Sequence, residues 1–593
     1  DPASPQYHAW LTPAQYAARF GLGAGDRARI QEWLRGQGFS VDAEGGANRV
    51  RFSGSAAQVE AAFQTELRRY DIDGEAHFAN ATELSLPAAL SGMVLGVGGL
   101  DDFRPRPRVR RLPPQFTSGQ SGNHFLAPGD IVRIFDVQPL YDAGFTGAGQ
   151  KIAIVGQTFI NRRDVDNFRS AAGLPATRLA MVPISSGGSD TYTPGNEDLI
   201  ESELDVEWSG GIARDATVEF VYARVGSGKS VRDALQYAIE HDVAPVISQS
   251  YGSCETQNTS LFNTVESWLS QAQAQGQTVV ASSGDAGAAD CDSGGSAKAS
   301  KGLAVDYPAS SPQVTGVGGT EFNEGGGSYW SGGEGQPDVI DSALSYIPEI
   351  AWNDTGKPRS SGSSSGGSGS SSGVIGLDAT GGGVSTRFAK PDWQVAPGVP
   401  GDGKRDVPDI SLPASPNHDG YLYCTTNSDN SAGCANGFRQ ADGTLTVAGG
   451  TSFGAPVFGG IMTLIAGKVS STRSLGLINP RLYQLANSGS GVYHDIVSGN
   501  NQVPTSGGST IGYVAGSGYD LTTGLGSMDV GALAQAWGSS SSGGSSSSGS
   551  GSSSGGSSAS SSSGGSSSGG SHGGGGGGGA VPPALLLSWL GLL

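Results

Sequence analysis

Lys151-Ile-Ala-Ile-Val-Gly156 is a short run of apolar, mostly β-branched residues with a charge only at its start. Three similar runs follow it, at Thr217-Val-Glu-Phe-Val-Tyr222, Ala244-Pro-Val-Ile-Ser248 and Gln277-Thr-Val-Val-Ala-Ser282. Such near-continuous apolar runs are typical of strands buried on both faces of a parallel sheet. Because helical segments lie between them, the pattern predicts one doubly wound α/β domain over residues 123–537. The clearest helical segments are residues 230–241 and 260–275.

The first part of the chain, residues 1–103, has a different pattern and predicts a small α+β unit. Residues 12–20 and 26–37 are predicted as helices, since each begins after a capping-type residue and ends at glycine. Residues 48–53 alternate as a strand does, and residues 55–67 carry apolar side chains at helical spacing.

A basic, proline-containing segment joins the two units. Arg104-Pro-Arg-Pro-Arg-Val-Arg-Arg111 has five arginines and two prolines in eight residues. Proline and like charge oppose packing, so residues 104–122 are predicted to be an exposed, protease-sensitive linker that contains the activation cleavage site. A basic patch that binds a partner is the alternative.

Low-complexity segments account for much of the glycine content, 98 residues in all. Residues 359–373 are interpreted as a surface loop insertion, and residues 538–579 as a flexible Ser/Gly tether. The apolar tail 580–593 is shorter than the roughly 20 residues that a membrane-spanning helix needs. It is interpreted as part of a membrane or cell-surface attachment signal, with a disordered end as the alternative.

The charge and cysteine content restrict the class of protein. A net charge of −19 argues against a nucleic-acid partner, because phosphate binding needs clustered Lys and Arg. The four cysteines show no zinc-ligand spacing, and an even count favours two disulfides, Cys424–Cys434 across a short loop and Cys254–Cys291 as the remaining pair. Four reduced thiols in a cytosolic enzyme are the alternative. The chain starts without a charged-then-apolar leader, so we expect a secreted protein whose signal has been removed.

A candidate nucleophile, Ser452, lies in Gly450-Thr-Ser-Phe-Gly-Ala-Pro456. This pattern predicts a tight turn into a helix whose backbone N–H groups could hold an oxyanion, although an ordinary helix N-cap serine would look similar. A serine hydroxyl needs a neighbour that takes its proton, and no histidine of the chain lies in a suitable glycine-flanked setting. The base would then be a carboxylate working in acid. The histidines are His8, His77, His124, His241, His418, His494 and His572.

Candidate carboxylates lie in Glu197-Asp-Leu-Ile-Glu-Ser-Glu-Leu-Asp-Val-Glu207, which has six acids in eleven residues. Glu201 and Asp205 are four residues apart, so a helix places them on one face, where their mutual repulsion should raise one pKa. The alternative is a solvated acidic helix face with no catalytic role, which is the usual explanation for a run of charges.

Two further groups of acidic residues are candidates. Asp285 follows a predicted buried strand, where active-site residues of open α/β sheets gather; it could help to hold an oxyanion when protonated, or simply cap a turn. Asp495-Ile496 and Gly516-Ser-Gly-Tyr-Asp520 combine carboxylates with backbone carbonyls, which are hard oxygen ligands that suit Ca²⁺.

Several motifs in order resemble those of the sedolisins, the serine-carboxyl peptidases that include kumamolisin and the lysosomal tripeptidyl-peptidase. The similarity extends over about residues 1–537. The motifs are Glu201-x-x-Leu204-Asp205, Ser283-Gly-Asp285, residues 307–320, residues 382–394, Val407-Pro-Asp409 and Gly450-Thr-Ser452.

The resemblance implies a subtilisin-like catalytic domain preceded by a ferredoxin-like inhibitory prodomain. It implies that Ser452 is the nucleophile, that Glu201 is the general base and acid and that Asp205 orients Glu201. It also implies that Asp285 completes the oxyanion hole. The family's prodomain usually starts several dozen residues earlier, so this one is expected to lack its first strand and helix. The implied Ca²⁺ ligands are the side chains of Asp495 and Asp520 and the carbonyls of Ile496, Gly516 and Gly518.

We therefore expect a secreted, monomeric, acid-active endopeptidase that acts on protein or peptide substrates and processes its own zymogen. The prodomain is the expected intramolecular inhibitor. The alternatives are a tripeptidyl exopeptidase of the same family and an inactive scaffold that binds surfaces.

Overall fold

The computed structural model describes most of the two folded units and, beyond them, one C-terminal strand. The predicted loop 359–373, linker residues 112–122 and the tether beyond Gly538 lie outside the described residues. The described ranges are residues 8–42, 46, 48–72, 74–111, 124–185, 187–256, 259–331, 339–358, 374–426, 433–441, 443–469, 474–538 and 585–589.

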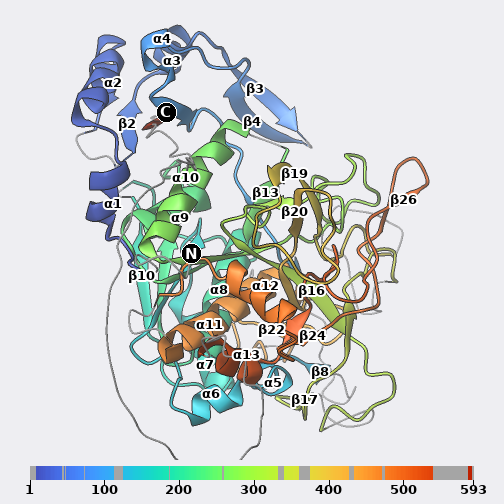
Figure 1. Cartoon of the computed structure of the whole chain (residues 1–593). Coiled ribbons are helices and arrows are strands. Elements are labelled where there is room, and N and C mark those ends of the chain that lie inside the picture. The colour runs from blue at the N-terminus through green and yellow to red at the C-terminus, as the bar shows by residue number, and fades with distance from the viewer. Residues whose placement is uncertain are drawn as a thin grey trace, which may run out of the picture.

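The larger unit, which the sequence predicts to be the catalytic domain and which keeps that name below, is built on the predicted, mostly parallel sheet (Figure 1). The strand order is β10-β11-β9-β12-β14-β16-β18, and β21 also pairs with β16. Every pair is parallel except β16 with β18. The strands are β9 (Lys151–Gly156), β10 (Leu179–Pro183), β11 (Thr217–Tyr222), β12 (Val246–Gln249), β14 (Thr278–Ser282), β16 (Thr315–Phe322), β18 (Glu349–Ala351) and β21 (Ile410–Pro413).

Both faces of this sheet are covered, as the unbroken apolar runs predict. In β9, Ala153 and Val155 pack with residues of α9 (Val231–Glu240) and α10 (Thr259–Gln275). Ile152 faces the opposite side, toward α8 (Glu197–Ile212) and α11 (Thr451–Val469). The predicted α/β fold is therefore confirmed.

Helix α11 is long and apolar enough to cross a membrane by composition alone. It lies instead at the centre of the catalytic domain, where residues Thr451 to Ala466 are all buried. Its apolar character is explained by packing against α8 and the sheet, so we interpret it as a core helix.

The N-terminal unit packs around Ile30, Leu34, Phe52 and Phe63. The helix predicted over residues 55–67 ends at Phe63, because Gln64 turns into the left-handed region and the chain continues as a strand from Leu67. The elements are α1 (Pro13–Phe20), α2 (Ala24–Gly36), β1 (Ser40–Val41), β2 (Arg49–Ser53), α3 (Ala56–Phe63), β3 (Leu67–Ile72), β4 (Glu75–Asn80), α4 (Ala88–Ser91) and β5 (Val94–Gly98).

The N-terminal unit sits on α9 and α10 of the catalytic domain (Figure 1). Arg49 pairs with Glu240 at 3.1 Å, and the Leu11 amide donates to the Ala274 carbonyl at 2.9 Å. Strand β28 (Leu585–Trp589), from the tail, lies between β2 and β5 and is parallel to both.

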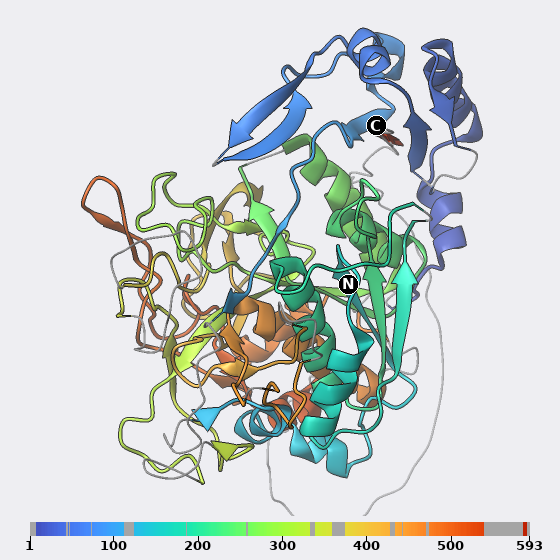
Figure 2. The ribbon, with the colours of Figure 1, turned by 180° about the vertical axis from the view of Figure 1, so that it is seen from behind.

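The linker leaves this unit and runs into the catalytic domain (Figure 2). Strand β6 (Arg106–Pro107) pairs antiparallel with β13 (Tyr251–Cys254), and β7 (Arg110–Arg111) pairs with β23 (Val447–Gly449). Pro105, Arg108 and Val109 are buried. Arg104 and Arg106 are exposed, as predicted. The prediction of an exposed linker is wrong for residues 108–110, because acidic side chains of the catalytic domain pair with Arg108 and Arg110.

Both predicted disulfides, Cys254–Cys291 and Cys424–Cys434, are present. The remaining helices and strands connect and extend the central sheet. They are β8 (His124–Phe125), α5 (Pro128–Ile134), α6 (Gln138–Asp142), α7 (Arg162–Ala171), β15 (Asp306–Tyr307), β17 (Val339–Ile340), β19 (Gly383–Ala389), β20 (Lys404–Val407), β22 (Tyr421–Leu422), α12 (Asn479–Asn487), β24 (Tyr493–His494), β25 (Val503–Pro504), β26 (Thr510–Ile511), β27 (Ser527–Met528) and α13 (Val530–Gly538).

Candidate active site

Ser452 is the second residue of α11, directly after the turn that leaves β23. The turn depends on Gly450, whose φ of +103° is a conformation that L side chains rarely adopt. A Cβ atom on Gly450 would also lie 2.5 Å from both the Arg108 carbonyl oxygen and Asp285 Oδ2. Glycine is thus required here for the backbone turn and for the close approach of the linker.

Helix α8 brings the predicted acidic pair to this serine. Its N-terminus is capped by Asn196, whose side chain accepts from the Asp198 amide at 2.8 Å. The Ser452 hydroxyl donates to Glu201 Oε2 at 2.8 Å. One helical turn later, Asp205 Oδ1 accepts a hydrogen bond from the Ser250 hydroxyl at 2.6 Å.

Glu201 and Asp205 are completely buried, so the alternative of a solvated acidic face does not describe this helix. Burial, followed by the charge of Asp205, raises the pKa of Glu201 well above its ordinary value, and burial raises the pKa of Asp205. Within the described part of the chain, Glu201 Oε1 and Asp205 Oδ2 accept no hydrogen bond. A proton held between these two carboxyl groups would satisfy both oxygens.

Asp285 contacts Thr451, the residue before the serine. Its Oδ1 accepts from the Thr451 amide at 2.9 Å and from the Thr451 hydroxyl at 2.7 Å, while no donor among the described residues reaches Oδ2. Burial raises the pKa of Asp285, and the charges of Arg110 and Arg108 oppose that rise. A neutral Asp285 could therefore donate a proton from Oδ2.

The serine has a carboxylate partner and, among the described residues, no imidazole partner. His418 contacts Glu324, His77 contacts Asp102 and His241 contacts the carbonyl oxygen of Tyr237. A carboxylate is therefore the only described group placed to accept the proton of Ser452.

The linker contacts Ser452 and Glu201 through the backbone of Arg108. The Arg108 amide donates to the Ser250 carbonyl at 3.1 Å and to Glu201 Oε2 at 2.8 Å. The Arg108 carbonyl oxygen accepts from the Ser452 amide at 3.3 Å. The carbonyl oxygen that an oxyanion hole binds belongs to the residue directly before the scissile bond.

Known protein families match both units of the chain. Residues 1–103 match the Pro-kumamolisin activation domain, and residues 187–482 match the subtilase family. Sedolisin from Pseudomonas sp. (strain 101) is 30% identical over 547 residues, which cover 90% of this chain and 82% of that protein. This chain belongs to the sedolisin family of serine peptidases.

Two more similarities support the same family. Kumamolisin from Bacillus sp. (strain MN-32) is 29% identical over 546 residues, which cover 88% of this chain and 85% of that protein. The structure of Pseudomonas sedolisin, a serine-carboxyl proteinase complexed with two molecules of pseudo-iodotyrostatin, is similar with a TM-score of 0.54 and 28% identity. The similarity covers 70% of this chain and 98% of that one, and it agrees with the subtilisin-like fold implied by the sequence motifs.

The sedolisin-type site contains acidic residues that sequence reasoning missed. Arg108 Nε lies 2.7 Å from Asp306 Oδ2, and Arg108 Nη2 lies 3.2 Å from Asp290 Oδ2. Both aspartate side chains are fully buried. No local pattern identifies them, because they are far apart from Arg108 in the sequence and converge only through strand pairing.

A second acidic cluster on α8 was also missed. Glu203 Oε1 accepts from the Asn161 amide at 3.1 Å, and Glu207 Oε2 accepts from the Cys424 amide at 3.0 Å. Asp164 of α7 accepts from the Gly433 amide at 2.6 Å and contributes to the raised pKa of Glu203, of which burial is the main cause. The sequence did contain a signal for this cluster. Glu203 and Glu207 repeat the four-residue spacing of Glu201 and Asp205, two residues later on the same helix.

Four of the predicted Ca²⁺ residues contact one another in pairs, Asp495 with Gly518 and Asp520 with Gly516. Asp495 Oδ2 accepts from the Gly518 amide at 2.9 Å, and Asp520 Oδ2 accepts from the Gly516 amide at 3.0 Å. The donor set, two carboxylates beside one glycine-containing loop, consists of hard oxygens and fits a cation such as Ca²⁺.

A different group, Glu324, His418 and Asp419, has its ligand atoms within 4.8 Å of one another. His418 Nε2 lies 3.1 Å from Asp419 Oδ2 and 3.0 Å from Glu324 Oε2. Hydrogen bonds to Asp419 and Glu324 raise the pKa of His418 to about 10. A protonated imidazole has no lone pair for a metal, so we interpret this group as an ion-pair cluster.

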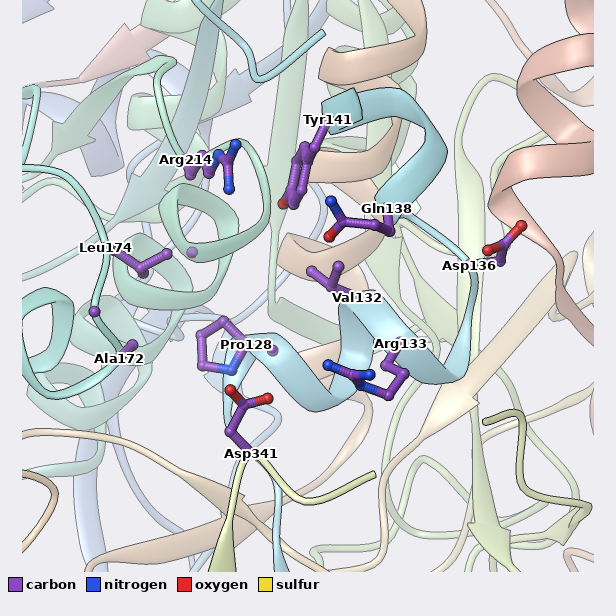
Figure 3. Close-up of a pocket in the computed structure, with 13 residues that line it drawn as sticks. Pro128, Val132, Arg133, Asp136, Gln138, Tyr141, Ala172, Leu174, Arg214 and Asp341 are labelled. Atoms are coloured by element: carbon purple, nitrogen blue, oxygen red, sulfur yellow. The ribbon is translucent and has the colours of Figure 1, made fainter. Parts of the chain in front are cut away.

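A surface pocket of about 390 Å³ lies between α5, α6 and the end of α8 (Figure 3). Arg214 covers the Tyr141 ring at 4.2 Å, and Asp341 lies at its opposite edge. None of its lining residues belongs to the catalytic group.

Proposed function

We propose that this sedolisin-family enzyme is an acid-active endopeptidase, made as a zymogen, that cleaves its own linker between Arg108 and Val109. One observation carries the proposal: the Arg108 carbonyl oxygen accepts from the Ser452 amide while the Ser452 hydroxyl donates to Glu201. Scissile carbonyl, nucleophile and base are then adjacent and in the order that acyl transfer requires.

Acylation starts when Glu201 takes the hydroxyl proton and Ser452 Oγ bonds to the Arg108 carbonyl carbon. The carbonyl oxygen becomes an oxyanion, which the Ser452 amide and a protonated Asp285 stabilise by hydrogen bonds. The bond from Arg108 to the Val109 nitrogen then breaks. Glu201 returns its proton to that nitrogen, so Val109 leaves as a free amine.

Hydrolysis of the acyl-enzyme repeats these roles with water. Glu201 removes a proton from water, the resulting bond to the Arg108 carbon releases Ser452, and the serine regains the proton. Asp205, held by Ser250, shares a proton with Glu201 and so orients it and sets its basicity.

Acid activity follows from the pKa directions. Burial raises the pKa of Glu201, Asp205 and Asp285, so the shared proton and the neutral Asp285 are present at low pH and lost as pH rises. Because the groups interact, the alkaline limb of activity reports the cluster and not one residue. Activity is therefore expected to fall from acid toward neutral pH.

Arginine is the proposed residue before the scissile bond. Asp290 and Asp306 form the S1 pocket, which holds that residue, and they already pair with Arg108. Burial raises the pKa of Asp290 to about 6, although Arg108 opposes the rise. The preference for arginine over leucine should therefore weaken as pH falls below about 6.

The prodomain is the proposed intramolecular inhibitor, because its linker fills the cleft that protein or peptide substrates would use. The described chain continues on both sides of Arg108, and this supports cleavage within a chain. An extracellular location is proposed from the two disulfides, as such bonds persist in oxidising compartments. Attachment to a cell surface through residues 580–593 and a monomeric state remain proposals from the sequence.

A bound Ca²⁺ is proposed at Asp495 and Asp520, with carbonyl oxygens of Ile496, Gly516 and Gly518 as further ligands. The cation would cross-link these loops and neutralise the two carboxylates, and it takes no part in acyl transfer.

The test is a pH series with the full chain and its Ser452→Ala variant, each incubated with a peptide containing Pro-Arg-Val. The wild type should process itself in acid, with a new N-terminus at Val109, and should release internal fragments from a protein substrate. Uniform tripeptides would indicate an exopeptidase instead. Absence of hydrolysis at every pH would indicate an inactive binding scaffold, and processing of the pure Ser452→Ala chain would refute the assigned nucleophile.

A further inference from the structure

Arg110, the second residue after the proposed scissile bond, also has a defined site. Arg110 pairs with Gly449 in the register of β7 and β23, so its backbone position is set by strand pairing. Its Nε lies 2.9 Å from Asp378 Oδ1, and its Nη2 donates to the Asp285 carbonyl oxygen at 3.1 Å. The guanidinium thus lies close to Asp378, with a longer contact of 3.7 Å from Nε to Asp285 Oδ2, and it donates to one carbonyl oxygen.

The walls of this site are close to the arginine. The Asp378 side chain is only 8% exposed, and that of Arg110 is 23% exposed. A Cβ atom on Gly294 would lie 1.7 Å from Arg110 Nη2. Since φ of Gly294 is outside the left-handed region, the need for glycine there is steric: any side chain would displace the guanidinium.

Asp378 is held in place by its own backbone. Its amide donates to Thr355 Oγ1 at 3.0 Å, and its carbonyl accepts from the Asp354 amide at 2.8 Å. A carboxylate fixed in this way and largely removed from water loses a partner when no cation binds, and that loss is costly. The site therefore favours a cationic side chain over a neutral one of similar size.

We propose that Asp378 and Gly294 form an S2′ pocket selective for arginine, so that the preferred substrates are Arg-X-Arg peptides cut after the first arginine. This inference rests on the proposed cleavage between Arg108 and Val109, which makes Arg110 the second residue after the scissile bond. The S1 acids bind the guanidinium of Arg108 and Asp378 binds that of Arg110, one residue on each side of Val109 in the sequence. Val109 between them is buried and contributes an apolar middle residue.

The test compares three peptides, Pro-Arg-Val-Arg, Pro-Arg-Val-Gln and Pro-Arg-Val-Ala with the same flanks, cleaved by full chain that has been activated in acid. An ion pair in a half-buried site predicts kcat/KM at least about tenfold higher for arginine than for glutamine, because a neutral side chain leaves the Asp378 carboxylate without its cation. Asp378→Asn should reduce this ratio to below about threefold and leave cleavage of the alanine peptide unchanged.

Gly294→Ala provides an independent test, because it fills the pocket without removing a charge. It should lower kcat/KM for the arginine peptide and spare the alanine peptide. The control is Asp392→Asn, which removes one exposed negative charge from the same domain and should preserve the wild-type ratio.

The outcomes separate this inference from the proposed function. Equal cleavage of the three peptides by the wild type, or an unchanged ratio in Asp378→Asn, would overturn the S2′ pocket alone; Asp378 would then be only a latch for the linker. Failure to cut any of the three peptides at any pH would overturn the proposed function and this inference with it.

Discussion

Helix α8 carries two pairs of carboxyl residues with the same four-residue spacing, Glu201 with Asp205 and Glu203 with Glu207. All four side chains are completely or almost completely buried. Burial is the main cause of a raised pKa in each of them. By spacing, burial and direction of the pKa shift, the two pairs are alike.

Their hydrogen-bond partners differ. Glu201 accepts from the hydroxyl of Ser452, a group that can attack a carbonyl carbon. Glu203 and Glu207 accept from the amides of Asn161 and Cys424, which are fixed parts of the backbone. A raised pKa therefore does not by itself mark a catalytic base; the reactivity of the group it touches does.

The sharpest test of this difference is a pair of isosteric substitutions. Glu201→Gln should slow self-cleavage of the full chain by about 10²- to 10⁴-fold, because the general base is lost. Glu203→Gln should change the rate by less than about threefold. The rates are measured in acid by the appearance of the new N-terminus. Equal loss in both variants would mean that the two pairs act as one unit.

Removing the Cys424–Cys434 disulfide should affect only the second pair, since Cys424 supplies the amide that Glu207 accepts from. The bond closes a loop of ten residues, and its loss from the double serine variant should lower the free energy of unfolding by about 2–3 kcal/mol. Urea unfolding in the Ser452→Ala background avoids self-cleavage. The pH profile of peptide cleavage should stay unchanged in the active chain, and a shifted profile would contradict the separation of the two pairs.

The second pair should also make stability depend on pH. Its folded-state pKa values lie above the unfolded ones, so the folded chain binds more protons between the two. Stability is therefore fully present below the unfolded values, near pH 4, and is lost as pH rises through the raised ones. Glu203→Gln with Glu207→Gln should flatten the decline of Tm between pH 4 and 7. A slope identical to that of Ser452→Ala alone would show that other buried acids dominate.

The smallest expected effect comes from a change that both pairs share. Asn196→Ala removes the N-cap of α8 and should cost about 1 kcal/mol of stability. Both pairs should respond equally, because they lie on the same helix. Self-cleavage and the slope of Tm against pH are the two readouts, and a selective loss of self-cleavage would indicate that the cap positions Glu201 in particular.

The fold could be predicted from the sequence because its signals are local. The four apolar runs from Lys151 to Ser282 correspond closely to β9, β11, β12 and β14, since a strand buried on both faces allows few polar residues. Boundaries were less accurate where a turn intervened, as at Gln64, whose left-handed conformation ends α3 early.

The clearest error was the prediction that linker residues 108–110 are exposed. Five arginines and two prolines predict a solvated segment when the chain is considered alone. The prediction failed because Asp290, Asp306 and Asp378, between 180 and 270 residues away in the sequence, supply the opposite charge in the folded protein. Charge compensation over such a separation leaves no local pattern.

The residue types at the catalytic centre were readable from the chain alone: a serine at a helix start, a glutamate and an aspartate one helical turn apart, and an aspartate after a buried strand. Each of these motifs consists of residues close together in the sequence, and the geometry of one helix or one turn fixes their relative positions. Which carboxylate touches the serine, and which arginine carbonyl lies against its amide, depends on the packing of α8 on α11 and on the pairing of β6 and β7. Those contacts join residues far apart in the chain, so they exist only once the whole domain has folded.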